Sequence, residues 1–361
     1  MYKFEDIIEE VNELNTDLRF GLDDIVGVTI EKGLIPTIAN LTQTALDKFY
    51  IIKPETFVYN PRTHGVRLGM GYNDTNNTYI TSWNNVAFRV KETARSIVIP
   101  QYLWLCFCRP SWDRLTNFLA WGSSTIVFAW REFLNISITL PTIEEQQEIV
   151  SEYETLSNRI RLNEQMIAKL EETAQALYRK MFVDGIDKEN LPEGWRMGTL
   201  GEVAFFKYGK LADKHTKSVE FPYPVFSGYA VTGYTNEYTL EEPTIVIVAR
   251  GDAGTGKICM SPPRCFLSNL AISIETKERS IKEYLYYYLL NSDTMSLRSG
   301  SAQAQITINN VEPFEIVLPT IEICVDFSHR VKTLYNNIIL YKQETEKLIE
   351  LQSLLLARMG K

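Results

Sequence analysis

The residue pattern closest to a known chemical motif is the glycine-rich run RGDAGTGKI at residues 250–258. Two glycines five positions apart, followed by lysine and preceded by an apolar strand, resemble the loop with which P-loop proteins bind nucleotide phosphates. Here Ile258 stands where serine or threonine would ligate magnesium, and the sequence CMSPP follows in place of a helix. We therefore interpret the run as a tight turn that carries two cations, Arg250 and Lys257.

No other group of residues fits a catalytic centre. An adenine methyltransferase would need a glycine-rich cofactor fold and an Asn/Asp-Pro-Pro-aromatic loop, but the sequence offers only SPPR at 261–264 and NPR at 60–62. The histidines His64, His215 and His329 share no motif with a nucleophile or an acidic partner. We expect no catalytic residue and no cofactor in this chain.

The five cysteines are an odd set without a CxxC pair, which is typical of reduced thiols in a cytoplasmic protein and predicts no structural metal. The first thirty residues are acidic and lack the apolar run of a secretory signal. No apolar stretch reaches the roughly 18 residues of a membrane span. We expect a cytoplasmic protein without a membrane anchor.

Two clusters of cations have the chemistry for binding nucleic acid, because arginine and lysine bind phosphates and read base edges. Both lie in turn-rich segments that we expect to form loops: the first cluster is Arg62, His64 and Arg67, and the second is Lys207, Lys210, Lys214, His215 and Lys217. Arg250 and Lys257 of the glycine-rich turn are further candidates. The net charge of -8 argues against a nucleic-acid binder, so these local clusters must overcome it. A single surface cation is ordinarily only solvated. Our prediction therefore rests on the clusters.

An internal repeat organises the elements that would hold these clusters. The sequence LPTIE occurs at residues 140–144 and again at 318–322, an offset of 178 positions that continues without gaps through the next forty residues. Each copy predicts a long helix that begins after a proline, with Thr142 or Thr320 as its cap. Looser similarity upstream extends the repeat into the domain before each helix.

Each predicted helix has apolar residues at alternating spacings of four and three, which is the pattern of a coiled-coil seam. The aliphatic residues that we expect to form the coiled-coil seam are Ile149, Leu156, Ile160, Leu170 and Leu177 in the first helix, and Val331, Leu334, Ile338, Leu348 and Leu355 in the second. Asn163, Thr345 and Gln352 are polar members of the two seams. A single stripe of this kind would usually pack on its own domain. The duplication favours pairing of the two helices with each other.

These patterns divide the chain into five segments. We expect two domains at 1–139 and 195–317, long helical segments at 140–184 and 318–361, and a linker at 185–194. Both domains mix short β-rich runs with turn residues and a helix. The fold class is therefore α+β, with two α/β domains separated by two long antiparallel helices in a pseudo-twofold repeat.

The chain resembles the specificity subunits of type I restriction–modification systems. The resemblance rests on LPTIEEQQEI at 140–149, LPEGW at 191–195 with TLGE at 199–202, and AQAL at 174–177. It covers essentially the whole chain. One departure is Cys324, which stands where Gln146 stands in the first copy and puts in doubt how this helix end contacts partners.

The resemblance implies a non-catalytic subunit that binds double-stranded DNA and directs partner methyltransferase and restriction-translocase subunits. S-adenosylmethionine, ATP and magnesium would belong to those partners. A seam from Ile149 to Met181 would be roughly 50 Å long, which predicts a split target longer than one turn of DNA. Because the two domains differ in sequence, the target should be asymmetric.

Two other interpretations stay open at this point. A coiled-coil scaffold joining two protein-binding domains would account for the acidity and the repeat without DNA. The chain is also compatible with the specificity module of a modification-only phage-defence system.

Overall fold

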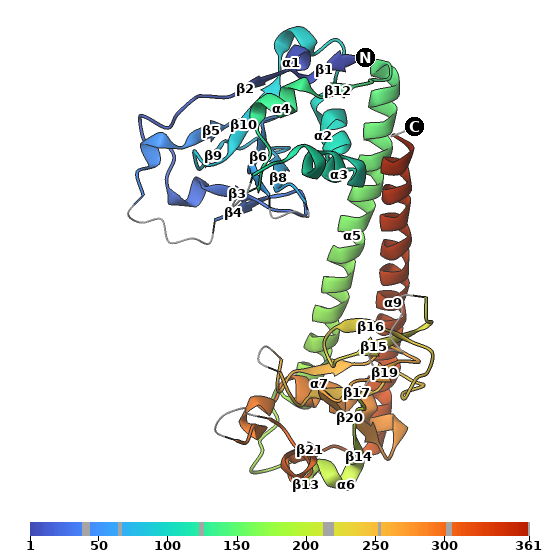
Figure 1. Ribbon diagram of the computed structural model, residues 1–361. Helices are drawn as coiled ribbons and strands as arrows, with labels where there is room; N and C mark the ends of the chain where they lie inside the picture. The colour runs from blue at the N-terminus through green and yellow to red at the C-terminus, as the bar shows by residue number, and fades with distance from the viewer. Residues whose placement is uncertain are drawn as a thin grey trace. The chain divides into compact units, whose positions relative to one another are not determined.

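The computed structural model describes residues 1–37, 44–63, 67–122, 126–211, 220–251, 254–300 and 305–359. The chain forms two compact units, Met1–Asn163 with Gln343–Lys361, and Glu164–Lys342. The boundary between the units falls inside both long helices, α5 (Ile143–Phe182) and α9 (Ile321–Arg358), so that each unit contains part of both (Figure 1). The mixture of helix and sheet confirms the α+β class.

The first unit is built on a four-stranded antiparallel sheet in the order β2-β10-β6-β8. These strands are β2 (Ile8–Glu10), β10 (Val86–Val90), β6 (Phe57–Tyr59) and β8 (Met70–Tyr72). Two-stranded pairs surround it: β1 (Tyr2–Lys3) with β12 (Ser137–Ile138), β3 (Val26–Val28) with β4 (Leu34–Pro36), β5 (Tyr50–Ile52) with β9 (Tyr79–Thr81), and β7 (Arg62–Thr63) with β11 (Ile126–Val127). The helices are α1 (Phe4–Ile7), α2 (Pro100–Cys108), α3 (Pro110–Leu119) and α4 (Trp130–Asn135).

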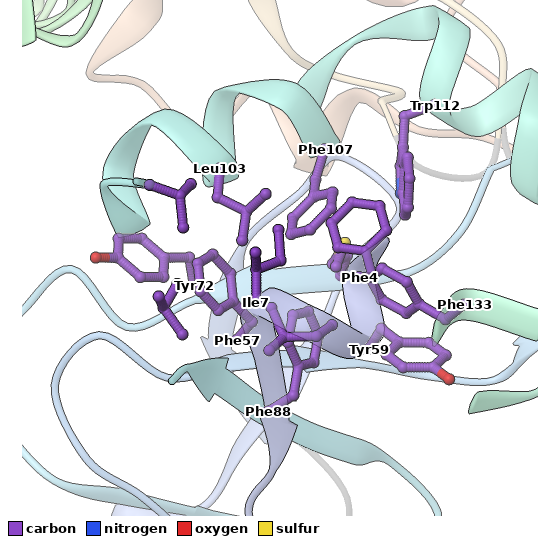
Figure 2. Packing of buried hydrophobic residues seen from close by; sticks show 14 of the residues in the cluster. Phe4, Ile7, Phe57, Tyr59, Tyr72, Phe88, Leu103, Phe107, Trp112 and Phe133 are labelled. Atoms are coloured by element: carbon purple, nitrogen blue, oxygen red, sulfur yellow. The ribbon is translucent and has the colours of Figure 1, made fainter. Parts of the chain in front are cut away.

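Aromatic packing holds the helices of this unit on its sheet. Figure 2 shows Leu103 and Phe107 of α2 pointing toward Phe57 and Phe88 on the strands. The ring of Phe107 meets that of Phe133 edge-on, with centroids 5.6 Å apart. Burying such rings supplies most of the apolar area in a core. The sheet and α2 therefore form a rigid base for the loops at the sheet's edges.

The second unit repeats this topology. Its sheet has the order β14-β20-β17-β18, with strands β14 (Ala204–Tyr208), β20 (Ala271–Thr276), β17 (Ile245–Val248) and β18 (Ile258–Met260). Around it lie β13 (Arg196–Thr199) paired with β21 (Glu315–Leu318), a sheet of β16 (Val231–Thr235), β15 (Tyr223–Phe226) and β19 (Phe266–Leu267), and the helices α6 (Leu200–Val203), α7 (Lys282–Leu290) and α8 (Ile308–Val311). Strands β2, β10, β6 and β8 correspond in order to β14, β20, β17 and β18. The repeat seen in the sequence is thus a repeat of fold.

The start of α5 shows why the LPTIEEQ segment has its sequence. Thr142 and Glu145 form a capping box, in which the Glu145 amide donates to Thr142 Oγ1 at 3.3 Å and the Thr142 amide donates to Glu145 Oε2 at 2.9 Å. Gln146 is fully buried, and its amide binds backbone atoms of Ile97, Ile99 and Pro141 at 2.9–3.0 Å. This glutamine fastens the helix to its own domain. Cys324 at the matching position of α9 is equally buried, in an apolar cluster with Phe327.

The two long helices pair inside each unit. In the first unit, Gln352 donates to Ser157 Oγ at 2.7 Å, and Asn163 donates to Glu344 Oε2 at 3.1 Å, so that the two segments run in opposite directions. In the second unit, Phe182 packs edge-on against Phe327 with centroids 5.1 Å apart.

The burial of the seam positions follows the predicted spacing. Buried or half-buried are Ile149, Leu156, Ile160, Leu348 and Leu355 in the first unit, and Leu170, Leu177, Val331, Leu334 and Ile338 in the second. Among the described residues no helix is at once long and apolar enough to cross a membrane.

Candidate nucleic-acid interface

In the second unit, four strand ends bring the candidate cations to one edge of the sheet. Strands β14 and β17 end at this edge, and β20 and β18 begin there, because each neighbouring pair is antiparallel. Of the residues described at this edge, three are exposed cations: Lys210, Arg250 and Lys257. No ion pair involves these three within the described part of the chain. They are therefore available to an anionic ligand.

The connection between β17 and β18, which carries Arg250 and Lys257, is stabilised by hydrogen bonds from two side chains, those of Arg298 and Thr294. The guanidinium of Arg298 donates through Nε to the carbonyl of Thr255 at 3.1 Å, and Thr294 Oγ1 donates to the carbonyl of Gly256 at 2.6 Å. Gly256 has φ +93°, and a Cβ atom there would lie 3.2 Å from Met295, so glycine is required. A strand, not a helix, follows Lys257, which agrees with the rejection of a P-loop.

An exposed aromatic ring lies beside this connection. Tyr229 is 50% exposed, and Lys257 Nζ lies 5.9 Å from the centre of its ring. Such a cation on an aromatic face is weakly attracted and keeps its charge. No local pattern points to Tyr229 or Arg298, because their partners are distant along the chain.

The second cluster is only partly where the sequence placed it. Lys207 lies in strand β14 instead of a loop, and its Nζ is 3.2 Å from Glu275 Oε2 on the neighbouring strand β20. Its charge is thus already balanced. Lys210 follows the strand, and Gly209 between them passes so close to Ser268 that a Cβ atom would lie 2.0 Å from its carbonyl oxygen. Lys214, His215 and Lys217 lie outside the described residues.

The first unit places its cations at the corresponding edge. The connection between β6 and β8 spans residues 60–69, the topological equivalent of the connection that carries Arg250 and Lys257. Arg62 lies in β7 and Arg67 just before β8, and both are exposed. His64 lies outside the described residues. The first predicted cluster and the glycine-rich run with Arg250 and Lys257 thus lie on equivalent connections of the fold, which the sequence alone did not indicate.

Charges of both signs lie at the opposite edge of the first unit's sheet. Asp6, Glu55, Asp74 and Glu92 lie two residues from strand ends there. Lys91 follows β10 directly, and Arg95 Nη1 lies 2.6 Å from Glu55 Oε2. In the second unit, the comparable edge pairs Glu242 with Arg279. The opposite edge is thus of mixed charge in both units.

A buried ion pair supports the connection that carries Arg67. Lys32 Nζ lies 2.6 Å from Asp113 Oδ1, and their side chains are only 8% and 13% exposed. Lys32 also donates to the carbonyl of Leu68 at 2.8 Å. Removing one partner of a buried pair typically costs about 3–5 kcal/mol, because the other charge is left without compensation. Burial raises the pKa of the adjacent Cys108 thiol to about 12, so that thiol is neutral.

Two domains of one topology, each with exposed cations on the same connection at a sheet edge, define a duplicated protein with two candidate nucleic-acid-binding edges. The family model described as "Type I restriction modification DNA specificity domain" matches residues 38–172 and 192–350. The chain belongs to this family.

Individual relatives are distant. The MjaVIII type I restriction enzyme specificity subunit of Methanocaldococcus jannaschii is 23% identical over 251 residues, which cover 60% of this chain and 59% of the relative. The HindI specificity subunit of Haemophilus influenzae is 22% identical over an alignment of 377 positions, gaps included. The match covers 80% of this chain and 81% of the relative. The chain thus spans about three fifths of the length of the first of these. A crystal structure of a type I restriction–modification S subunit from M. genitalium has the same fold, with a TM-score of 0.64, 17% identity, and coverage of 99% and 95%.

Proposed function

We propose that this protein is the DNA-specificity subunit of a type I restriction–modification complex, and that each unit reads one half of a split target. The observation that carries the proposal is the equivalent connection in each unit, which presents exposed cations in a family defined by DNA specificity. Arginine and lysine on such connections can reach base edges in a groove while others fix the register on phosphates.

The two edges differ in sequence and so should differ in what they read. The connection in the first unit carries Arg62 and Arg67, whereas that in the second carries Arg250 and Lys257 beside Tyr229. A target read by two different surfaces is asymmetric, in contrast to the palindrome read by a symmetric dimer. We expect a bipartite motif with unlike halves.

The chemistry would belong to partner subunits. A methyltransferase partner would flip the target base and methylate it with S-adenosylmethionine, and a restriction-translocase partner would use ATP and magnesium. This chain would act without a cofactor or catalytic residue of its own, in the cytoplasm. The acidic, exposed side of α5, with Glu144, Glu148 and Glu152, is suited to contacting protein and not DNA.

Methylome sequencing tests this function. The chain is expressed with the methyltransferase encoded beside it, in a host that lacks adenine methylation. We expect a methylated, split and asymmetric motif that is missing when either protein is expressed alone. An active, purified methyltransferase complex that leaves no such motif would instead favour a coiled-coil scaffold joining protein-binding domains. A motif without any restriction activity would identify a modification-only system.

A further inference from the structure

A cavity of about 460 Å³ opens in the first unit beside the connection that carries Arg67. It lies between the turn joining β3 to β4, the start of α3 and the sides of α5 and α9 within this unit. Its charged lining residues are Glu31, Lys32, Arg67, Asp113 and Arg114. Trp104, Cys108 and Tyr153 form less polar walls.

The buried ion pair of Lys32 and Asp113 forms a rigid part of the cavity lining. Lys32 has φ +67°, a left-handed conformation that is uncommon for a residue with a side chain. Its ammonium joins Asp113 to the carbonyl of Leu68, and the Leu68 amide lies 3.4 Å from the same Asp113 oxygen. Both the amide and the carbonyl of Leu68 are therefore hydrogen-bonded to the ion pair. These contacts fix the backbone next to Arg67.

Two arginines at the cavity have no ion-pair partner among the residues that the structure describes. Arg67 and Arg114 are both exposed and line the cavity from different elements, and neither makes an ion pair within the described residues. Lys32 and Asp113 balance each other, which leaves two guanidinium groups against the single carboxylate of Glu31. A concave site with partly apolar walls strengthens the attraction of these guanidinium groups for an anion.

We propose that this cavity binds one phosphodiester group of the DNA backbone, with Arg67 and Arg114 as its ligands and with Lys32 and Asp113 as positioning residues. This inference rests on the proposed function. Guanidinium groups bind phosphate oxygens with two parallel hydrogen bonds, and two arginines that line one concave space match a charged group better than a neutral base edge. The contact fixes the register of the first unit on DNA without reading sequence.

The salt dependence of DNA binding tests the two ligands. The complete complex with its methyltransferase is titrated with duplexes that contain or lack the target motif. We expect Arg67→Ala and Arg114→Ala each to reduce the slope of log K against log salt by about 0.9. Both duplexes should lose affinity by the same factor. The control Lys3→Ala removes one exposed cation next to the opposite edge of the sheet and should leave the slope unchanged.

A neutral phosphate analogue shows whether the two arginines share one site. Single methylphosphonate linkages are placed in turn along the target duplex. A position is called sensitive for a variant where the linkage weakens the wild-type complex and weakens that variant less. One position, or two adjacent positions, should be sensitive for both Arg67→Ala and Arg114→Ala, and the linkage there should have no effect on the double variant, which has lost both ligands. If the sensitive positions of Arg67→Ala and Arg114→Ala differ, the shared cavity is wrong. If no position is sensitive, the anion is not DNA, and an acidic segment of a partner subunit is favoured instead.

The positioning role needs a variant that keeps the fold. Lys32→Met/Asp113→Leu removes both buried charges together, so that neither is left unpaired. We expect an unchanged Tm and a slope reduced as in Arg67→Ala, because Arg67 is no longer held. A wild-type slope in this variant would contradict positioning.

Two further outcomes separate the failure of this inference from the failure of the proposed function. A change in the recognised motif with Arg67→Ala would show base reading and overturn the phosphate assignment. A wild-type complex that binds no split target would overturn the proposed function itself.

Discussion

The five cysteines show how packing controls the chemistry of single residues. All five are free thiols, and Cys106, Cys265 and Cys324 are buried. Burial raises the pKa of Cys106 to about 11 and that of Cys324 to about 12, because the thiolate would lose its hydration. The thiolate is the reactive form. These residues are therefore suited to packing and not to redox chemistry.

This predicts slow reaction with a thiol reagent. At pH 8 the reagent should modify Cys106 in the native protein about 100-fold more slowly than it modifies an exposed thiol. The smaller fraction of thiolate at Cys106 is enough to give this difference. Unfolding in guanidinium chloride should make all five thiols react at once. Absorbance after addition of a disulfide reagent measures both rates. Rapid labelling of Cys106 or Cys324 in the native protein, located by mass spectrometry, would contradict the packing described here.

Single residues also mark the limit of what the sequence could predict about the interface. The connections that carry Arg62 and Arg250 are recognisable from local composition, since turn residues and cations are neighbours in the chain. The neutralisation of Lys207 by Glu275 is not, because 68 residues separate them. The pair of Lys32 and Asp113, 81 residues apart, was likewise beyond a reading of local patterns.

At the scale of elements, the long helices were the most predictable part. Their seams follow a spacing set by helix geometry alone, so the sequence specifies which positions are buried. The sheets were less predictable, because their strands are mostly three to five residues long and pair with distant partners. The order β2-β10-β6-β8 depends on tertiary packing that no local pattern encodes.

Asn163 is the polar member of the seam in α5. We expect it to lower the free energy of unfolding while it fixes the register of the paired helices. It is 1% exposed and donates to Glu344 and Thr345 at 3.1 and 3.4 Å. A polar group at such a position fixes the alignment of paired helices and lowers stability. We expect Asn163→Leu to raise the free energy of unfolding by about 1 kcal/mol or more. It should also allow mis-registered or oligomeric forms.

Thermal unfolding and light scattering after size exclusion measure the two effects. Asn158→Leu is the matched control, because Asn158 lies on the same helix and is exposed, so the same substitution there should leave Tm nearly unchanged. A lower Tm in Asn163→Leu would mean that the hydrogen bonds to Glu344 and Thr345 contribute net stability. A higher Tm with a single monomeric species would leave the register to the apolar seam residues alone.

At the scale of the whole molecule, duplication is the central feature. Both units have one strand order and one place for exposed cations, yet the residues at that place differ. A gene that duplicates a DNA-binding domain and then diverges keeps the fold and changes the bases read, because base contacts depend on a few side chains. Substitutions at one edge should therefore affect one half of the target.

This gives a prediction for the methylome of three variants expressed with the partner methyltransferase. Arg62→Ala should relax one half of the methylated motif, and Arg250→Ala/Lys257→Ala should relax only the other half, since each lost base contact costs roughly 1–3 kcal/mol of discrimination. Lys207→Ala removes the same type of charge from the second unit, but its ion pair with Glu275 already balances that charge, so both halves should persist. If any one variant relaxed both halves together, the two edges would not read DNA independently, and the assignment of one half-site to each unit would be wrong.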